Sequence, residues 1–293
     1  MNAPGFVGGW FDRADRLRIS GEADGALQGR MDARLLLLNG LDPQFDARGE
    51  LSWGPLFDAP DGAGLLFLGL DEAERPCYCA LADLPRGMAP LNRHLWPGLT
   101  ALPADQASLY ATARSLVDWH NRHRFCAVCG SETHVVKAGW SRHCAACGAE
   151  HFPRVDPVVI MLVEHAGKVL LGRQPRFPKR QFSALAGFIE PGETIEGAVI
   201  RELHEEAGIR AHSVRYVASQ PWPFPSSLMI GCLALTDDPA ITLDEQELEE
   251  AIWVSAADVR DAMDGGADAS FGVPPPLAIA HFLLRAWLDE MGV

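Results

Sequence analysis

The chain has 293 residues, enough for two domains that each bury their own core. Its net charge of −14, from 39 acidic and 25 basic residues, disfavours a general nucleic-acid binder. No run approaches the roughly 18 apolar residues of a membrane helix, and the first residues lack a signal-peptide layout. We therefore expect a cytoplasmic protein.

The first 118 residues alternate short apolar runs with turn residues. RLLLLNG (34–40) and GLLFLGL (64–70) are typical of strands, and the clusters of Gly, Asp and Pro between such runs favour turns. Residues 107–120 place apolar side chains at helical spacing and predict a helix. This part carries no catalytic motif, and we expect a separate N-terminal α+β domain over 1–118.

Residues 119–152 hold two Cys-x-x-Cys pairs, each followed by a glycine. Cys126 and Cys129 form the first pair, and Cys144 and Cys147 form the second. Four thiolates complete a tetrahedral zinc shell and leave no position for water, so the spacing predicts a structural zinc ribbon. The odd total of seven cysteines also favours reduced thiols over disulfides. The segment is locally basic, which leaves binding of an RNA 5′ end open.

The remaining residues, 153–293, read as a third domain of mixed strands and helices. Gly167 predicts the turn of a hairpin, and three prolines at 274–276 introduce the last helix. The expected strands are 157–165, 168–174, 184–189, 214–220 and 227–235, and the expected helices are 194–207 and 277–291.

The helix expected over 194–207 carries a cluster of carboxylates. Thr194 suits the N-cap and Gly208 suits a left-handed stop. Glu202 and Glu206 are four residues apart on one stripe, with Glu205 beside them. Carboxylates crowded in this way repel one another unless cations bind, and hard oxygen ligands suit Mg²⁺ or Mn²⁺. The pattern predicts a divalent-metal site that binds phosphate oxygens.

Residues 187–209, GFIEPGETIEGAVIRELHEEAGI, match every fixed position of the motif GX5EX7REUXEEXGU, where U is aliphatic. This motif resembles the box of the Nudix hydrolase family, which cleaves a nucleoside diphosphate linked to another group. The resemblance implies an α/β/α sandwich with a mixed sheet, within an overall α+β or α/β class. It also implies catalytic roles for Glu202, Glu205 and Glu206. The implied ligands of Mg²⁺ or Mn²⁺ are Ala186 (through its carbonyl), Glu202, Glu205, Glu206 and Glu247, with Glu250 as a second choice to Glu247.

Downstream of this box lies SQPWPFPSS, residues 219–227, in which three prolines alternate with two aromatic residues. Because proline fixes φ and donates no backbone hydrogen bond, we expect the alternating prolines, residues 221–225, to lie outside sheets and helices. The segment resembles the signature of the NADH pyrophosphatase subgroup, whose members also carry a four-cysteine zinc ribbon before the Nudix domain. The implied substrate contacts are Phe152, Gln220, Pro221, Trp222, Pro223, Phe224, Pro225, Ser226, Ser227 and Ala280.

The subgroup resemblance implies a homodimer that hydrolyses NAD(H) to nicotinamide mononucleotide and AMP and that removes the NAD cap from RNA. Two alternatives stay open. One is a Nudix enzyme for another dinucleotide, such as ADP-ribose or a diadenosine polyphosphate. The other is a zinc-ribbon nucleic-acid-binding regulator with a vestigial Nudix domain, which the intact REUXEE sequence disfavours.

Overall fold

A computed structural model of the chain describes residues 3–8, 11–81, 84, 92–265 and 269–292. The contacts divide the chain into two compact units. One contains Phe6–Val155 together with Pro221–Ser226, and we call it the N-terminal unit. The other contains Met1–Gly5, Asp156–Gln220 and Ser227–Val293, and we call it the catalytic unit after the carboxylates that the sequence predicts for catalysis. The three-part division at residues 118 and 152 stays a prediction.

The N-terminal unit is built on a four-stranded sheet of order β4-β1-β6-β5, and the long helix α3 packs against β5 and β6. A short pair, β2 and β3, and the three-stranded sheet of the ribbon, β7-β8-β9, complete its strands. The strands are β1 Arg34–Leu36, β2 Leu38–Asn39, β3 Asp42–Pro43, β4 Trp53–Pro55, β5 Gly64–Leu70, β6 Pro76–Leu81, β7 His134–Val136, β8 Ser141–His143 and β9 Glu150–His151. The helices are α1 Asp15–Ser20, α2 Trp96–Ala101 and α3 Ala104–Arg122.

The catalytic unit contains a six-stranded mixed sheet of order β13-β14-β10-β11-β15, with β12 paired to β10. Its strands are β10 Asp156–His165, β11 Lys168–Arg173, β12 Leu185–Phe188, β13 Ala211–Trp222, β14 Ser227–Thr236 and β15 Glu250–Ser255. Its helices are α4 Ile195–Ala207, α5 Ala256–Met263 and α6 Ile279–Glu290. The predicted hairpin forms around Gly167, whose φ of 74° is left-handed.

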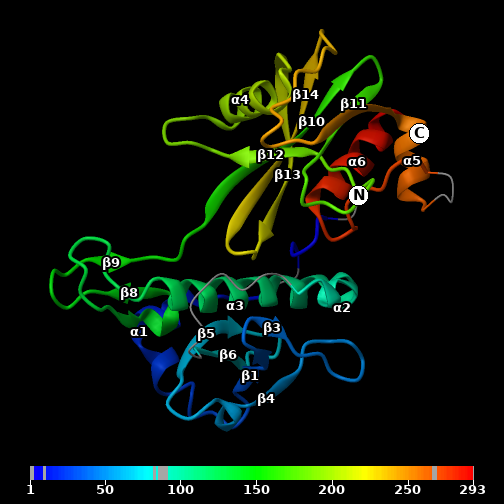
Figure 1. Ribbon diagram of the computed structural model, residues 1–293. Coiled ribbons are helices and arrows are strands. Elements are labelled where there is room, and N and C mark those ends of the chain that lie inside the picture. Colours follow the sequence, from blue (N-terminus) through cyan, green and yellow to red (C-terminus); the bar gives the residue numbers. More distant parts are fainter. Residues whose placement is uncertain (1–2, 9–10, 82–83, 85–91, 266–268, 293) are drawn as a thin grey trace. The chain divides into compact units, whose positions relative to one another are not determined.

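Helices cover both faces of this sheet (Figure 1). Alternate side chains of β10 point to opposite sides because a strand has a period of two. Val159 and Met161 pack with Leu203 of α4 in one core, whereas Ile160 packs with Leu283 of α6 in the other. The catalytic unit therefore has the α/β/α arrangement expected from the sequence. Among the described residues, no helix is long and apolar enough to span a bilayer.

One expectation about the proline-rich stretch is wrong. Pro221 lies inside β13, which extends to Trp222. β13 is an edge strand, since it stands at the end of the strand order. An edge strand tolerates proline because its outward side needs no ladder hydrogen bond.

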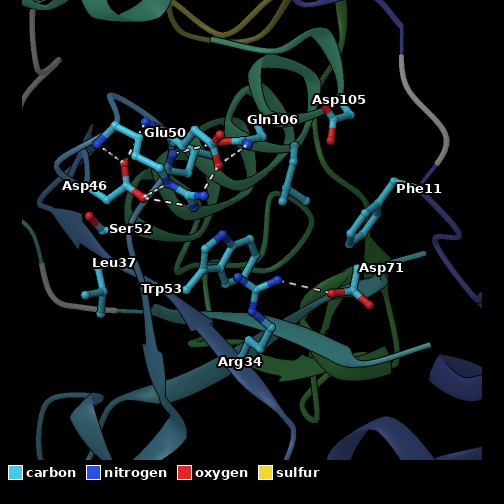
Figure 2. A pocket seen from close by; sticks show the side chains of 13 residues that line it. Phe11, Arg34, Leu37, Asp46, Glu50, Ser52, Trp53, Asp71, Asp105 and Gln106 are labelled. Carbon is cyan, nitrogen blue, oxygen red and sulfur yellow. Dashed lines mark hydrogen bonds and ion pairs between the residues drawn. The ribbon is translucent and has the colours of Figure 1, made fainter. Parts of the chain in front are cut away.

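A pocket of about 530 Å³ opens in the N-terminal unit (Figure 2). Trp53 forms part of its wall, and the guanidinium of Arg34 stacks 4.2 Å from the centre of that ring. Both arginines that line the pocket pair with acids of its wall, Arg34 with Asp71 at 3.2 Å and Arg48 with Asp46 at 3.3 Å. None of the residues predicted for catalysis lines this pocket.

Candidate active site and zinc ribbon

The Nudix-like box begins on β12, which pairs antiparallel with β10 so that Ala186 lies opposite Ile160. The next residue, Gly187, packs directly against the carboxylate of Glu202. A Cβ on Gly187 would lie only 1.9 Å from the Cδ and Oε1 atoms of that side chain. A glycine at this position lets the carboxylate of Glu202 lie against the strand, and a larger residue would displace that carboxylate.

Helix α4 presents the predicted carboxylates on two different faces. Its N-cap Thr194 accepts a hydrogen bond from the Gly197 backbone N–H at 3.1 Å, as the sequence predicts. Glu202 and Glu206 lie on the buried face, with 9% and 3% of their surfaces exposed. The side chain of Glu205, in contrast, is 58% exposed. Two carboxylates are thus held against the protein, and one faces outward.

Arg201 connects the box residues through its guanidinium group. Its Nε donates to Glu193 at 2.7 Å, and its Nη1 donates to Glu202 at 2.8 Å and to Glu205 at 2.9 Å. Its Nη2 donates to the Phe188 carbonyl at 2.9 Å. The hydrogen bonds from Arg201 lower the pKa of the Glu193 carboxyl to about 2. One arginine therefore orients two of the predicted metal ligands and ties the helix to β12.

The buried carboxylates have perturbed protonation equilibria. Burial, followed by the charges of Glu202, Glu247 and Asp244, raises the pKa of Glu206 to about 8. Burial also raises the pKa of Glu202, against the opposing effect of its arginine neighbour. The charge of Glu247 contributes to both shifts, whereas Glu250 lies on β15 opposite Arg173, and the choice between the two as a metal ligand stays a prediction.

Asp244 joins this cluster without having been predicted. Its backbone N–H donates to the Glu206 carbonyl at 3.0 Å, so it is fixed beside the end of α4. The only signal in the sequence was the acidic run DEQELEE, in which Asp244 is one of several acids. Burial and then the neighbouring acids raise the pKa of Glu206, and a divalent cation would offset the mutual repulsion of these carboxylates. The chemistry of the donor set thus fits a hard cation.

The second predicted metal site is more compact. Among the residues that the structure describes, the four cysteines are the one group of three or more potential ligands whose donor atoms all lie within 4.8 Å of one another. The Sγ atoms of Cys126 and Cys147 are 3.6 Å apart, and those of Cys129 and Cys144 are 3.5 Å apart. Tetrahedral zinc with bonds of about 2.3 Å requires sulfurs roughly 3.8 Å apart, so the four thiols fit the ion.

The two halves of the ribbon have the same backbone geometry. Gly130 donates to the Cys126 carbonyl at 2.9 Å, and Gly148 donates to the Cys144 carbonyl at 2.8 Å. Both glycines have a φ of 77°, which other residues rarely adopt. In addition, Nε2 of His151 lies 3.2 Å from the Sγ of Cys126. This left-handed backbone conformation explains why a glycine follows each cysteine pair.

Gln220 has its hydrogen-bonding groups occupied within the protein. Its side chain is fully buried, and its Nε2 donates to the carbonyls of Gly5 and Leu277, both at 2.7 Å. Its Oε1 accepts from the backbone N–H of Ile279 at 2.9 Å. The amide of Gln220 thus links β13 to the N-terminal residues and to the start of α6, all within the catalytic unit. Its contact with substrate stays a prediction.

The other predicted substrate residues differ in accessibility. Phe152 is 62% exposed, with the Nζ of Lys137 5.4 Å from its ring centre. Ser226 is buried, and Ala280 lies in the first turn of α6, 2% exposed and packed in the core. Phe188 was not predicted, yet it is 62% exposed at the end of β12, beside the box. Its place in the motif, before another apolar residue, does not predict that exposure. The substrate roles stay predictions.

Comparison with known proteins decides the family. The pattern of the NUDIX domain matches residues 153–271, and that of the NADH pyrophosphatase zinc ribbon domain matches residues 121–152. An "NAD-capped RNA hydrolase NudC" from Mycobacterium bovis is 37% identical over 294 residues, which cover 94% of this chain and 92% of that protein. The chain belongs to the Nudix family. The predicted family and fold class are thereby confirmed.

A second relative shares only part of its length with this Nudix chain. The "NAD-capped RNA hydrolase NUDT12" from Homo sapiens is 48% identical over 202 residues. These residues cover 66% of this chain but 44% of the human protein, so the chain spans less than half of that relative. Among solved structures, a NUDIX hydrolase from Nitrosomonas europaea aligns with a TM-score of 0.46 at 22% identity, covering 58% of this chain and 92% of that one.

Proposed function

We propose that this Nudix chain hydrolyses the pyrophosphate bond of NAD(H), giving nicotinamide mononucleotide and AMP, and removes the NAD cap from RNA 5′ ends. The observation that carries the proposal is the match along almost the whole chain to a protein named as an NAD-capped RNA hydrolase. The zinc ribbon, the box and SQPWPFPSS follow one another in that order along the chain, which supports the same assignment.

The carboxylates of the box would hold the catalytic cations. We assign Mg²⁺ or Mn²⁺ to Glu202, Glu205, Glu206 and Glu247, with the carbonyl of Ala186. When bound, such ions polarise the phosphoryl oxygens and lower the pKa of water. The protein contributes by fixing Glu202 against β12 and by keeping Glu206 in a buried, acidic environment. The exposed Glu205 is the carboxylate of the three that solvent reaches most easily.

The aromatic side chains would recognise the two bases of the dinucleotide. A base stacked on an aromatic face gains about 1–3 kcal/mol, and a ring held on a proline-restricted backbone loses little entropy on binding. We assign this role to Trp222 or Phe224, with Phe152 and Phe188 as exposed rings that can take a second base. Ser227 would hydrogen-bond the ribose or phosphate.

The zinc ribbon would serve as a structural element, and its zinc is proposed as a resident ion separate from catalysis. Its donor set consists of four cysteines, which fills a tetrahedral shell. The family resemblance further supports a homodimer. Sedimentation of the purified protein tests that assignment, since a monomer at micromolar concentration would reject it.

Kinetics with purified protein test the substrate. We expect kcat/KM to be highest for NADH or NAD⁺ and lower for ADP-ribose, with activity dependent on added Mg²⁺ or Mn²⁺. RNA with an NAD cap should yield a 5′-monophosphate end, whereas matched RNA with a 5′-triphosphate serves as the control. Preference for ADP-ribose or a diadenosine polyphosphate would overturn the substrate assignment. Activity unchanged in Glu206→Gln would overturn the catalytic one.

A further inference from the structure

The segment Pro221–Ser226 contains the last two residues of β13 and the turn that leads to β14, yet its contacts place it in the N-terminal unit. The residues on either side of it, Gln220 and Ser227, belong to the catalytic unit. Six consecutive residues between two parts of the catalytic unit are therefore grouped with the N-terminal unit. These six residues contain both aromatic side chains of the proline-rich signature.

Aromatic side chains of the N-terminal unit surround the two rings. Trp222 and Phe224 lie 5.2 Å apart, centre to centre, in an edge-to-face contact. Phe6, which is 1% exposed, lies 6.0 Å from each of them. Trp96 of α2 lies 5.8 Å from Trp222 and 6.3 Å from Phe224. Contacts at these separations fix ring orientation and stabilise the cluster.

Helix α3 supplies the polar contacts. Arg114 is 2% exposed, and its Nε donates to the Pro223 carbonyl at 2.9 Å. Its Nη1 donates to the Leu41 carbonyl at 2.8 Å, and its guanidinium lies 4.7 Å from the centre of the Phe224 ring. The hydroxyl of Ser115 donates to the Pro225 carbonyl at 3.4 Å. Arg114 thus contacts both the backbone and one aromatic ring of Pro221–Ser226.

These contacts are needed because of the composition of the segment. Three of its six residues are prolines, which have no backbone N–H, so Pro221–Ser226 has few backbone donors of its own, although Pro221 and Trp222 still belong to β13. Its carbonyls and rings must instead be fixed by groups from elsewhere in the chain. A buried guanidinium that donates to two carbonyls holds its neighbours in one geometry more firmly than a flexible ammonium could.

We propose that a function of the N-terminal unit is to hold the substrate-recognition segment in place, with Arg114, Phe6 and Trp96 as positioning residues. The inference rests on the proposed function, because it takes Trp222 and Phe224 as the rings that meet the dinucleotide. It gives a role to a part of the chain that carries no catalytic motif. Displacing a binding group by about 1 Å can cost about 100-fold in rate, so loss of these contacts should be visible in catalysis.

The test compares variants of the full-length protein. Trp96→Ala removes one wall of the aromatic cluster, and Trp96→Phe keeps a ring there. Arg114→Lys keeps the charge but loses the guanidinium fork, whereas Arg114→Ala removes both. Arg122→Ala is the matched control, because Arg122 lies on the same helix and pairs with Asp118 instead of the segment. Retained zinc and an unchanged circular dichroism spectrum select the variants that fold.

Two measurements are made on each variant: kcat/KM for NADH, and hydrogen exchange of the amides in residues 221–227. We expect Trp96→Ala and Arg114→Lys to lower kcat/KM about 10- to 100-fold and to speed exchange in the segment. Trp96→Phe should recover most of the activity, and Arg122→Ala should match the wild type. Unchanged exchange together with kcat/KM within about twofold of wild type in Trp96→Ala would overturn the inference.

The exchange measurement keeps this inference separate from the proposed function. If the wild-type protein did not cleave NADH, the substrate assignment would fail. Faster exchange at 221–227 in Trp96→Ala would still show that the N-terminal unit holds the segment. If NADH were cleaved and exchange did not change, the proposed function would stand and the positioning role would fail.

Discussion

Replacing Glu206 by glutamine should stabilise the protein at alkaline pH while it removes activity. Glu206 is 3% exposed, and its pKa rises from the usual 4.5 to about 8 because of burial and of the charges on Glu202, Glu247 and Asp244. A carboxyl whose folded pKa is raised binds more protons when folded than when unfolded. Its contribution to stability is therefore complete below pH 4.5 and is lost as pH rises toward 8.

The size of the effect follows from this shift. Between pH 5 and pH 8 the wild type should lose about 3 kcal/mol of unfolding free energy through Glu206, since each pKa unit corresponds to about 1.4 kcal/mol. The amide of Glu206→Gln does not ionise, so the variant keeps this stability. The difference in unfolding free energy between Glu206→Gln and the wild type should therefore increase by about 3 kcal/mol from pH 5 to pH 8. A packing difference that is the same at both pH values does not affect this change.

Urea unfolding followed by circular dichroism at pH 5 and pH 8, without added divalent cation, measures this difference. Glu205→Gln is the control, because the Glu205 side chain is 58% exposed and should change stability by less than about 1 kcal/mol. Added Mn²⁺ should stabilise the wild type more than Glu206→Gln, and pyrophosphatase activity of the variant should fall at least about 100-fold. An equal stability gap between wild type and Glu206→Gln at both pH values would refute the electrostatic reasoning.

Two other changes test the contacts around the metal sites. Gly187→Ala would place a Cβ 1.9 Å from the Glu202 carboxylate. We therefore expect activity to fall about 100-fold with little change in the circular dichroism spectrum. Normal activity would mean that this carboxylate can move freely. His151→Ala removes the group 3.2 Å from the Cys126 sulfur, and zinc release to a chromophoric chelator should become about 10-fold faster. The exposed His134→Ala is the control, and equal release rates in both variants would show that the contact does not retain zinc.

Features that depend on residues close together in the chain could be predicted from the sequence. The N-cap Thr194 and the left-handed Gly208 define α4 because capping interactions span only a few residues. The spacing of Glu202 and Glu206 places both on one stripe because a helix has 3.6 residues per turn. The zinc ribbon follows in the same way from two short cysteine turns.

Features that depend on distant residues could be seen only in the tertiary structure. The sequence singled out the proline-rich segment but did not show that Arg114, over a hundred positions earlier, donates to its backbone at Pro223. Nor did it show that folding brings the amide of Gln220 to Gly5, 215 positions away. It also did not distinguish Asp244 from its acidic neighbours.

The local pattern of this sequence thus determined which chemistry each motif carries, because capping, helical spacing and paired cysteines act within a few residues. The tertiary structure decided which groups surround each motif, because burial, charge crowding and buried hydrogen bonds arise only when segments far apart in the chain pack together. The raised pKa of Glu206 and the attachment of Trp222 to the N-terminal unit both belong to this second kind.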